Sequence, residues 1–128
     1  MKPSINDIDK YLQEVKRFIS CNRYQIDRNP KRADNIALFD NYVIDEKDAK
    51  EILLNLTPYD FSEVRNNDHT GYEHELLYVF GKDVKLLERY GDKEKTVSLY
   101  IKFNKLENRY VIVISFHEQK FPLKYCFK

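Results

Sequence analysis

Four polar side chains occupy alternate positions in two β-like segments near the C-terminal end of the sequence: Tyr100 and Lys102, then Ser115 and His117. A phenol, an ammonium, a hydroxyl and an imidazole on one sheet face suit acid–base chemistry on a phosphodiester. Cleavage of RNA without a metal ion needs a base for the 2′-hydroxyl, cations for the phosphate and an acid for the departing 5′ oxygen. His117 is the natural acid or base, because an unperturbed imidazole titrates near pH ~6.5.

The alternation of the two segments is what would bring these side chains together. Successive side chains of a strand point to opposite faces, and an antiparallel sheet can bury one face and leave the other open. We therefore expect two apolar sets to share the core face: Val97, Leu99, Ile101 and Phe103 in the first segment, and Ile112, Ile114 and Phe116 in the second. Val111 and Val113 would then share the open face with Ser115 and His117. Polar residues on such a face are also typical of solvated surface, and this alternative stays open.

The first sixty residues are predicted to be largely helical. Apolar residues recur at helical spacing from Ile8 to Ile19, after a capping residue that is Ser4 or Asn6. A short helix is expected over residues 31–39. Another begins after Asp45, with acidic residues in its first turn, and ends at Thr57-Pro58. Its predicted buried face consists of Ala49, Ile52, Leu53 and Leu56.

The remaining residues are predicted to form a sheet. Strands are expected over residues 76–84, 96–103, 110–118 and 123–127, with polar turns over 89–95 and 104–109. Helices followed by strands give the α+β class. We therefore predict one domain, residues 1–128, with N-terminal helices packed on one face of a C-terminal antiparallel β-sheet.

Composition narrows the range of functions. The 128 residues carry a formal net charge of +1, which argues against a strongly basic nucleic-acid tail but not against a local basic face. The sequence has no apolar run of the ~20 residues that a membrane span needs. Residues 1–10 lack the apolar core of a signal peptide, so a cytoplasmic location is expected. Cys21 and Cys126 are expected to be reduced and semi-buried.

Two other segments hold candidate binding residues. The basic stretch with Arg23, Arg28, Lys31 and Arg32 could contact RNA phosphates or an acidic partner, although a solvated turn is the default. The segment from Asp68 to Glu75 contains His69 and His74, which leaves open a metal-assisted hydrolase, but the spacing is not that of HExxH. The glycine-rich nucleotide loops and the GxSxG elbow are absent from the sequence.

Several short motifs, in order along the chain, resemble one protein family. They are Leu56-Thr57-Pro58-Tyr59-Asp60-Phe61, Val79-Phe80-Gly81-Lys82-Asp83-Val84, Leu99-Tyr100-Ile101-Lys102-Phe103, Val113-Ile114-Ser115-Phe116-His117-Glu118 and Phe121-Pro122-Leu123-Lys124-Tyr125. Together they resemble the MqsR family of bacterial toxins, most closely from residue 49 onward. The helix before Arg23, the basic strand-like stretch at Arg23 and the Asp45 helix are also similar.

This resemblance implies a fold and an activity. The fold would be that of RelE-type toxins, and the activity metal-independent, ribosome-independent cleavage of mRNA by an mRNA interferase. It also implies a monomeric cytoplasmic protein without a cofactor, neutralised by a cognate antitoxin. A non-catalytic interaction or RNA-binding module of the same fold is the alternative.

The resemblance also implies roles for individual residues. The catalytic tyrosine motif of the family matches Tyr100 with Lys102, and His117 stands where the better-known branch has lysine. Lys82 aligns with a glutamine. Glu63 replaces a family lysine, a departure for which Arg65, two residues on, can supply the missing charge. The candidate catalytic residues are therefore His117, Tyr100, Lys82, Lys102 and Arg65, and the candidate RNA contacts are Arg23, Arg28, Lys31, Arg32 and Lys124.

Overall fold

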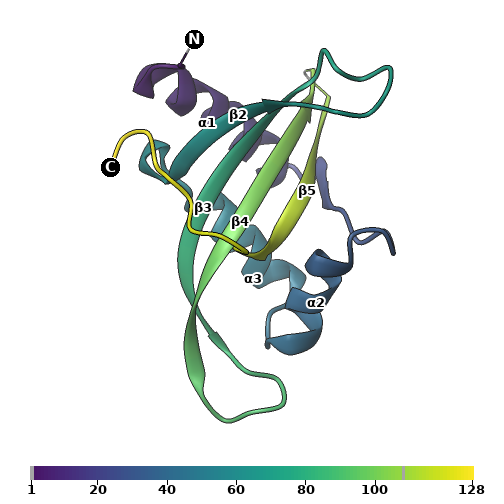
Figure 1. Cartoon of the computed structure of the whole chain (residues 1–128), viewed down its shortest axis with the longest axis vertical. Coiled ribbons are helices and arrows are strands. Elements are labelled where there is room, and N and C mark those ends of the chain that lie inside the picture. Colours follow the sequence, from purple (N-terminus) through teal and green to yellow (C-terminus); the bar gives the residue numbers. More distant parts are fainter. Residues whose placement is uncertain (1, 108) are drawn as a thin grey trace.

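The chain folds into helices and one sheet, as shown by a computed structural model that describes residues 2–107 and 109–128 (Figure 1). The described residues form α1 (Ile5–Ser20), β1 (Tyr24–Ile26), α2 (Ala33–Asn41), α3 (Glu46–Leu54), the 3-10 turn η1 (Pro58–Asp60), β2 (Phe61–Asn66), β3 (Leu76–Leu87), β4 (Glu94–Leu106) and β5 (Tyr110–Glu118). The predicted α+β class is confirmed. The turn predicted over residues 104–109 begins too early, because β4 continues to Leu106, and its residue 108 lies outside the described residues.

The sheet has the strand order β1-β5-β4-β3-β2. Strands β2 to β5 form an antiparallel meander, whereas β1 pairs in parallel with β5, from Tyr24 opposite Val111 to Ile26 opposite Val113. The sheet is therefore mixed, and the prediction of a purely antiparallel sheet is wrong. Parallel neighbours need a long crossover, and here the chain from α2 to β4 supplies it.

Helices α1 and α3 begin where their capping residues predict. The Ser4 side chain accepts a hydrogen bond from the Asp7 backbone N–H, and the Asp45 side chain accepts one from Asp48, each pair forming a capping box. Ile8, Leu12, Val15 and Ile19 are fully buried, as their spacing predicts. Helix α2 begins two residues later than expected, because Arg32 closes a turn onto the Asn29 carbonyl at 2.7 Å and becomes its N-cap residue.

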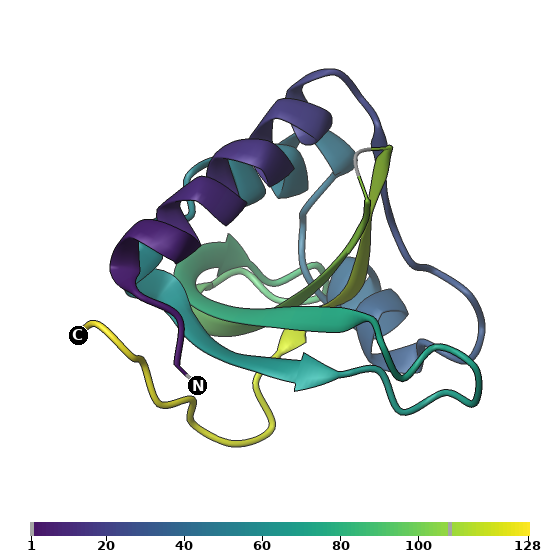
Figure 2. The same ribbon diagram turned by 90° about the horizontal axis from the view of Figure 1, so that it is seen from above.

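The core lies between the sheet and α1 and α3. Figure 2, seen from above, places α1 on one side of the sheet and the C-terminal tail on the other. Four phenylalanines without exposed surface form the centre of the core: Phe61, Phe80, Phe103 and Phe116. Val97, Leu99 and Ile101 are also buried there, which confirms the predicted core face of β4.

A β-bulge in β5 corrects the predicted faces of that strand. Ser115 pairs with Lys102, but Val113 pairs with Phe103, so Ile114 is an extra residue between them. The bulge reverses the alternation, and Val111 and Val113, not Ile112, join Phe116 in the core. Strict alternation is therefore wrong for the first half of β5 and right from Ser115 onward.

Helix α2 covers the edge of β5 beyond the end of β1. The Asn35 side chain donates to the Asp27 and Ile114 carbonyls, at 2.8 and 2.9 Å, and accepts from the Phe116 N–H at 2.8 Å. This amide, only 1% exposed, replaces the strand that β5 lacks at this point. It also fixes α2, and Arg32 at its N-terminus, against the sheet.

Residues 119–128, the C-terminal tail, cross the sheet face opposite α1 (yellow in Figure 1). The Ser62 hydroxyl donates to the Lys124 carbonyl at 2.6 Å, and the Cys126 N–H donates to the Phe61 carbonyl at 3.2 Å. The strand predicted over residues 123–127 is wrong, because the tail is held by such separate bonds and not by a ladder. Gly81 lies beneath it, where a Cβ atom would stand 2.3 Å from the Tyr125 hydroxyl.

Two further expectations concern the surface. Cys21 and Cys126 are both free thiols, but both are exposed, so their predicted partial burial is wrong. Within residues 2–107 and 109–128, every helix is too short or too polar to span a bilayer.

Candidate active site

Tyr100 and His117 stack on each other on the sheet face opposite α1. They are register partners across β4 and β5, and their ring centroids lie 5.2 Å apart with an interplanar angle of 11°. Lys102 and Ser115 are the next pair on the same face. The structure therefore confirms the predicted grouping of these four residues.

The backbone selects which nitrogen of His117 can exchange a proton. Nδ1 lies 2.7 Å from the Glu118 carbonyl oxygen. A carbonyl only accepts, so Nδ1 must carry a hydrogen and donate it in both charge states of the ring. Nε2 is consequently the atom that gains and loses the proton. An imidazole held in this tautomer can act as an acid at Nε2 when it is charged.

Lys102 is the centre of a group of three cations. Burial, and then repulsion by Arg32 and Arg65, lower the pKa of Lys102, while Asp68 acts weakly in the opposite direction. Over residues 2–107 and 109–128, no carboxylate comes within ion-pair distance of Lys102 Nζ. A half-buried ammonium between two guanidinium groups is a favourable place for an anion.

Arg65 and Glu63 form the β2 side of the site. They lie on the same strand face, as predicted, with Nη1 of Arg65 3.4 Å from Oε1 of Glu63. Burial raises the pKa of the Tyr100 phenol. The charge of Arg65 lowers this pKa, and the charge of Glu63 raises it. Tyr100 therefore stays protonated at neutral pH and can donate a hydrogen bond to an anion.

Arg32 joins the site from α2, although the sequence placed it only in the basic stretch. It lies near enough to Lys102 to lower its pKa, while its Nε lies 3.4 Å from Asp27 Oδ2. The Asn35 amide, three residues later, places Arg32 in the site because it docks α2 on β5. The partners of this amide are backbone groups, so no sequence motif indicates the contact.

Lys82 does not belong to this site. It pairs with Leu99, so its side chain leaves the sheet on the α3 side, where Nζ lies 3.3 Å from Asp60 Oδ2. The other predicted RNA contacts are scattered. Arg28 is paired with Glu46 and stacked on Phe39, whereas Arg23, Lys31 and Lys124 are exposed in separate segments.

The His69/His74 loop does not gather into a metal-ligand group. Glu75 instead accepts hydrogen bonds from the side chains of Asn67 and Asn104, at 3.0 and 3.1 Å. In the described part of the chain, no three His, Cys, Asp or Glu side chains come close enough to hold an ion.

No protein-family model matches this chain, and neither a curated protein nor a solved structure matches it. Function must therefore be inferred from the site itself.

Proposed function

We propose that this protein is a metal-independent endoribonuclease, the toxin of a type II toxin–antitoxin pair with a RelE/MqsR-like fold. The observation that supports the proposal best is that His117, stacked on Tyr100, lies on the same sheet face as Lys102, which forms a group of three cations with Arg32 and Arg65. An RNA phosphate would be held by the cations with the imidazole beside it. The toxin role, the cytoplasmic location and the cognate antitoxin rest on the resemblance of the motifs.

The proposed reaction is attack of the 2′-hydroxyl on the adjacent phosphorus, which forms a 2′,3′-cyclic phosphate and breaks the bond to the 5′ oxygen. Protonated His117 gives its Nε2 proton to that oxygen, which leaves as a 5′-hydroxyl. Lys102, Arg65 and Arg32 stabilise the charge that grows on the phosphate. Glu63, on the same face, is available to accept the proton of the 2′-hydroxyl, and Tyr100 donates a hydrogen bond or stacks on a base.

The proposal is tested by incubating the purified protein with end-labelled single-stranded mRNA in EDTA. We expect cleavage that yields 5′-hydroxyl and 2′,3′-cyclic phosphate ends. Binding of the RNA without cleavage would favour the non-catalytic module. Products with 5′-phosphates, or activity only after a divalent ion is added, would contradict the mechanism.

Lys102→Met is expected to weaken RNA binding and to stabilise the fold. Removing one phosphate contact should reduce the slope of log K against log salt by about 0.7 for a single strand. The free energy of unfolding should rise by about 0.5 kcal/mol, because the substitution removes a charge that is disfavoured by burial first and by the two guanidinium groups second, at a half-exposed position. Filter binding at several salt concentrations and urea titration measure the two effects.

The stabilising effect of Lys102→Met should also depend on pH. The folded chain binds the Lys102 proton less tightly than the unfolded chain does, so wild type gains stability as the pH rises from the lowered pKa towards 10.5. The difference between the variant and wild type should therefore shrink in alkaline buffer. Lys95→Met, at an exposed position of the same strand, is the control, and an equal effect there would contradict this explanation.

A further inference from the structure

The outer edge of β3 has a gap in its pairing. Strand β2 pairs with β3 only as far as Phe80. Beyond the gap, the Val43 N–H donates to the Leu87 carbonyl at 2.8 Å and the Arg89 N–H to the Asn41 carbonyl at 2.9 Å. These two bonds identify the odd-numbered residues as those whose backbone groups point outward, since successive residues of a strand alternate in direction.

Asp83 and Lys85 therefore present their N–H and C=O groups at the open edge, beyond the Phe61–Phe80 pair. None of residues 2–107 and 109–128 supplies a hydrogen-bond partner to these groups. An unpaired edge of this kind is a template for another extended chain.

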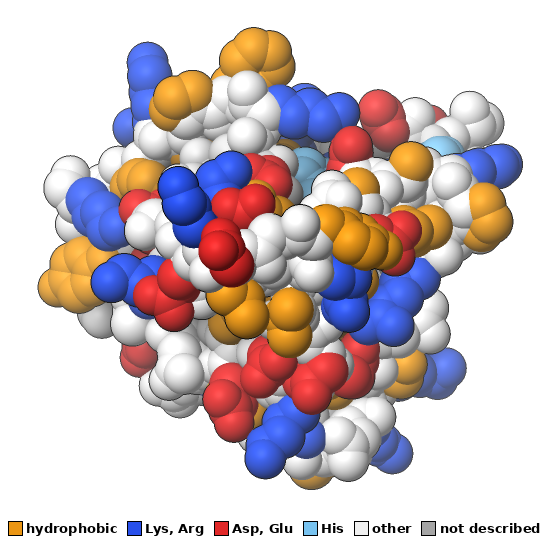
Figure 3. All heavy atoms as spheres, turned by 90° about the horizontal axis from the view of Figure 1, so that it is seen from below, with side chains coloured by type: hydrophobic (Ala, Val, Ile, Leu, Met, Phe, Trp, Pro, Cys, Tyr) orange, Lys and Arg blue, Asp and Glu red, His pale blue; other side chains and the backbone are white. Residues whose placement is uncertain are grey.

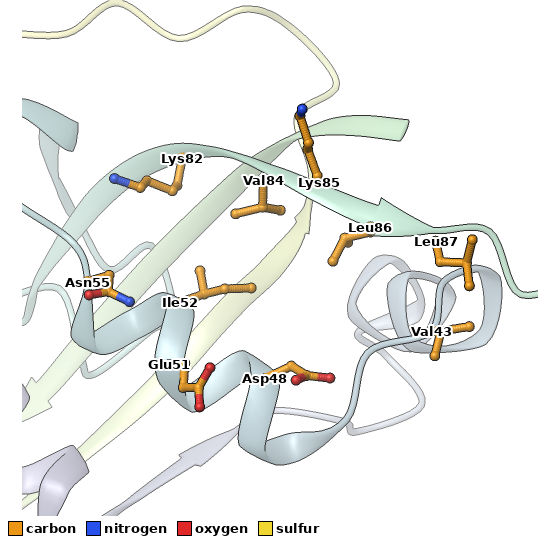
Figure 4. Close-up of a pocket in the computed structure, with 10 residues that line it drawn as sticks. All are labelled: Val43, Asp48, Glu51, Ile52, Asn55, Lys82, Val84, Lys85, Leu86 and Leu87. Carbon is orange, nitrogen blue, oxygen red and sulfur yellow. The ribbon is translucent and has the colours of Figure 1, made fainter. Parts of the chain in front are cut away.

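Two cavities lie beside the gap, on opposite faces of the sheet. The first, of about 390 Å³, lies between β3 and α3 (Figure 4), where Val84, Leu86 and Ile52 give it an apolar floor. The second, of about 360 Å³, lies beneath the C-terminal tail, where Asp83, Ser98 and Gln119 make it polar. A strand added to the edge would direct alternate side chains into the two cavities.

The ends of the gap decide what kind of chain can enter. Strand β2 closes one end and residues 41–43 close the other, and both lie in the plane of the sheet. A second copy of β3, paired antiparallel, would bring its own β2 against residues 41–43. A linear segment has no such neighbours and can bend away at both ends.

The charge beside the apolar cavity defines the segment further. Asp48 and Glu51 of α3 line it, and Figure 4 shows both carboxylates at its helix side, while Lys85 points away from it. Viewed from below, acidic side chains gather on the helix side of the molecule next to hydrophobic ones (Figure 3). Val43 and Leu87, 49% and 46% exposed, extend the apolar surface.

We propose that the edge of β3 from Lys82 to Leu86 binds a flexible, extended segment of a partner protein by strand addition. The segment places apolar side chains between β3 and α3, polar ones beneath the tail, and a lysine or arginine beside Asp48 and Glu51. The open edge of β3 does not include Tyr100 or His117, although the polar cavity lies on the same sheet face as their rings. The proposal does not rest on the nuclease activity.

Selection of random linear peptides displayed on phage, with the full-length protein as target, tests the proposal. The recovered peptides are synthesised and measured by fluorescence anisotropy against wild type, Lys85→Pro and Lys85→Thr. Proline removes the outward N–H of residue 85 and leaves the β4 ladder intact, whereas threonine keeps it. We expect peptides that alternate apolar and polar residues, that bind Lys85→Pro about tenfold more weakly, and that bind Lys85→Thr like wild type.

Two further measurements keep the outcome unambiguous. N-methylation of the peptide amides that face β3 should cause the same loss, whether or not Lys85→Pro folds. His117→Ala should bind the peptides unchanged, which separates this surface from the nuclease site. Recovery of no binding peptide, or of peptides indifferent to both changes, would overturn the proposal. So would a wild-type dimer that Lys85→Pro converts to monomers in sedimentation, because a second copy would then be the occupant.

Discussion

His117→Ala is expected to slow RNA cleavage by about 10²- to 10⁴-fold, the usual contribution of a positioned general acid. Nδ1 is committed to the Glu118 carbonyl, so the side chain has one atom, Nε2, to give a proton to the leaving oxygen. Without it, the 5′ oxygen must leave as an alkoxide or take its proton from water. Single-turnover cleavage of an end-labelled RNA measures the loss directly.

His117→Ala should leave RNA binding nearly unchanged, because Lys102, Arg65 and Arg32 remain in place. His69→Ala is the matched control, since this histidine is exposed in a separate loop. A fully active His117→Ala protein, or an equal loss in His69→Ala, would remove His117 from the mechanism.

Asn35→Ala is expected to lower the free energy of unfolding by about 2–4 kcal/mol. The substitution leaves buried backbone groups of Ile114 and Phe116 without partners, and each such group costs about 1–3 kcal/mol. Urea or thermal denaturation followed by circular dichroism measures the loss. The variant that remains folded should also bind RNA less tightly, because Arg32 is positioned by the same helix.

Asn41→Ala tests whether the effect belongs to the buried amide. Asn41 is the last residue of α2 and its side chain is exposed, so this substitution should change stability by less than about 0.5 kcal/mol. Similar losses of stability in the two variants would mean that the intrinsic helix propensity of α2 stabilises it, and not the bonds of Asn35 to β5.

Much of the fold could be predicted because local signals act independently of the rest of the chain. The caps at Ser4 and Asp45 fix two helix starts, and β5 covers residues 110–118 as expected. The bulge at Ile114 could not be predicted, because both faces of residues 111–114 are equally apolar. The pairing of β1 with β5 depends on a contact between distant segments that no local pattern encodes.

The candidate site was predictable where it depends on one pair of strands. Tyr100, Lys102, Ser115 and His117 share a face because alternation within β4 and the second half of β5 is regular. Lys82 was misplaced because its face depends on the register of β3 against β4, which its own residues do not reveal. Arg32 was not predicted to belong to the site, because the docking of α2 on the sheet brings it near Lys102, and its position in the sequence does not indicate this.

The parallel pairing of β1 with β5 has a consequence for the order of folding. The hairpins from β2 to β5 join neighbours in sequence, whereas Tyr24 must find Val111 across most of the chain. Closing a longer loop costs more entropy, and local pairings form faster than distant ones. The meander that carries Tyr100 and His117 can therefore assemble early, while β1 and α2 must wait for a completed β5. We therefore expect the stacked rings and Lys102 to be brought together first, and Arg32 to reach them last.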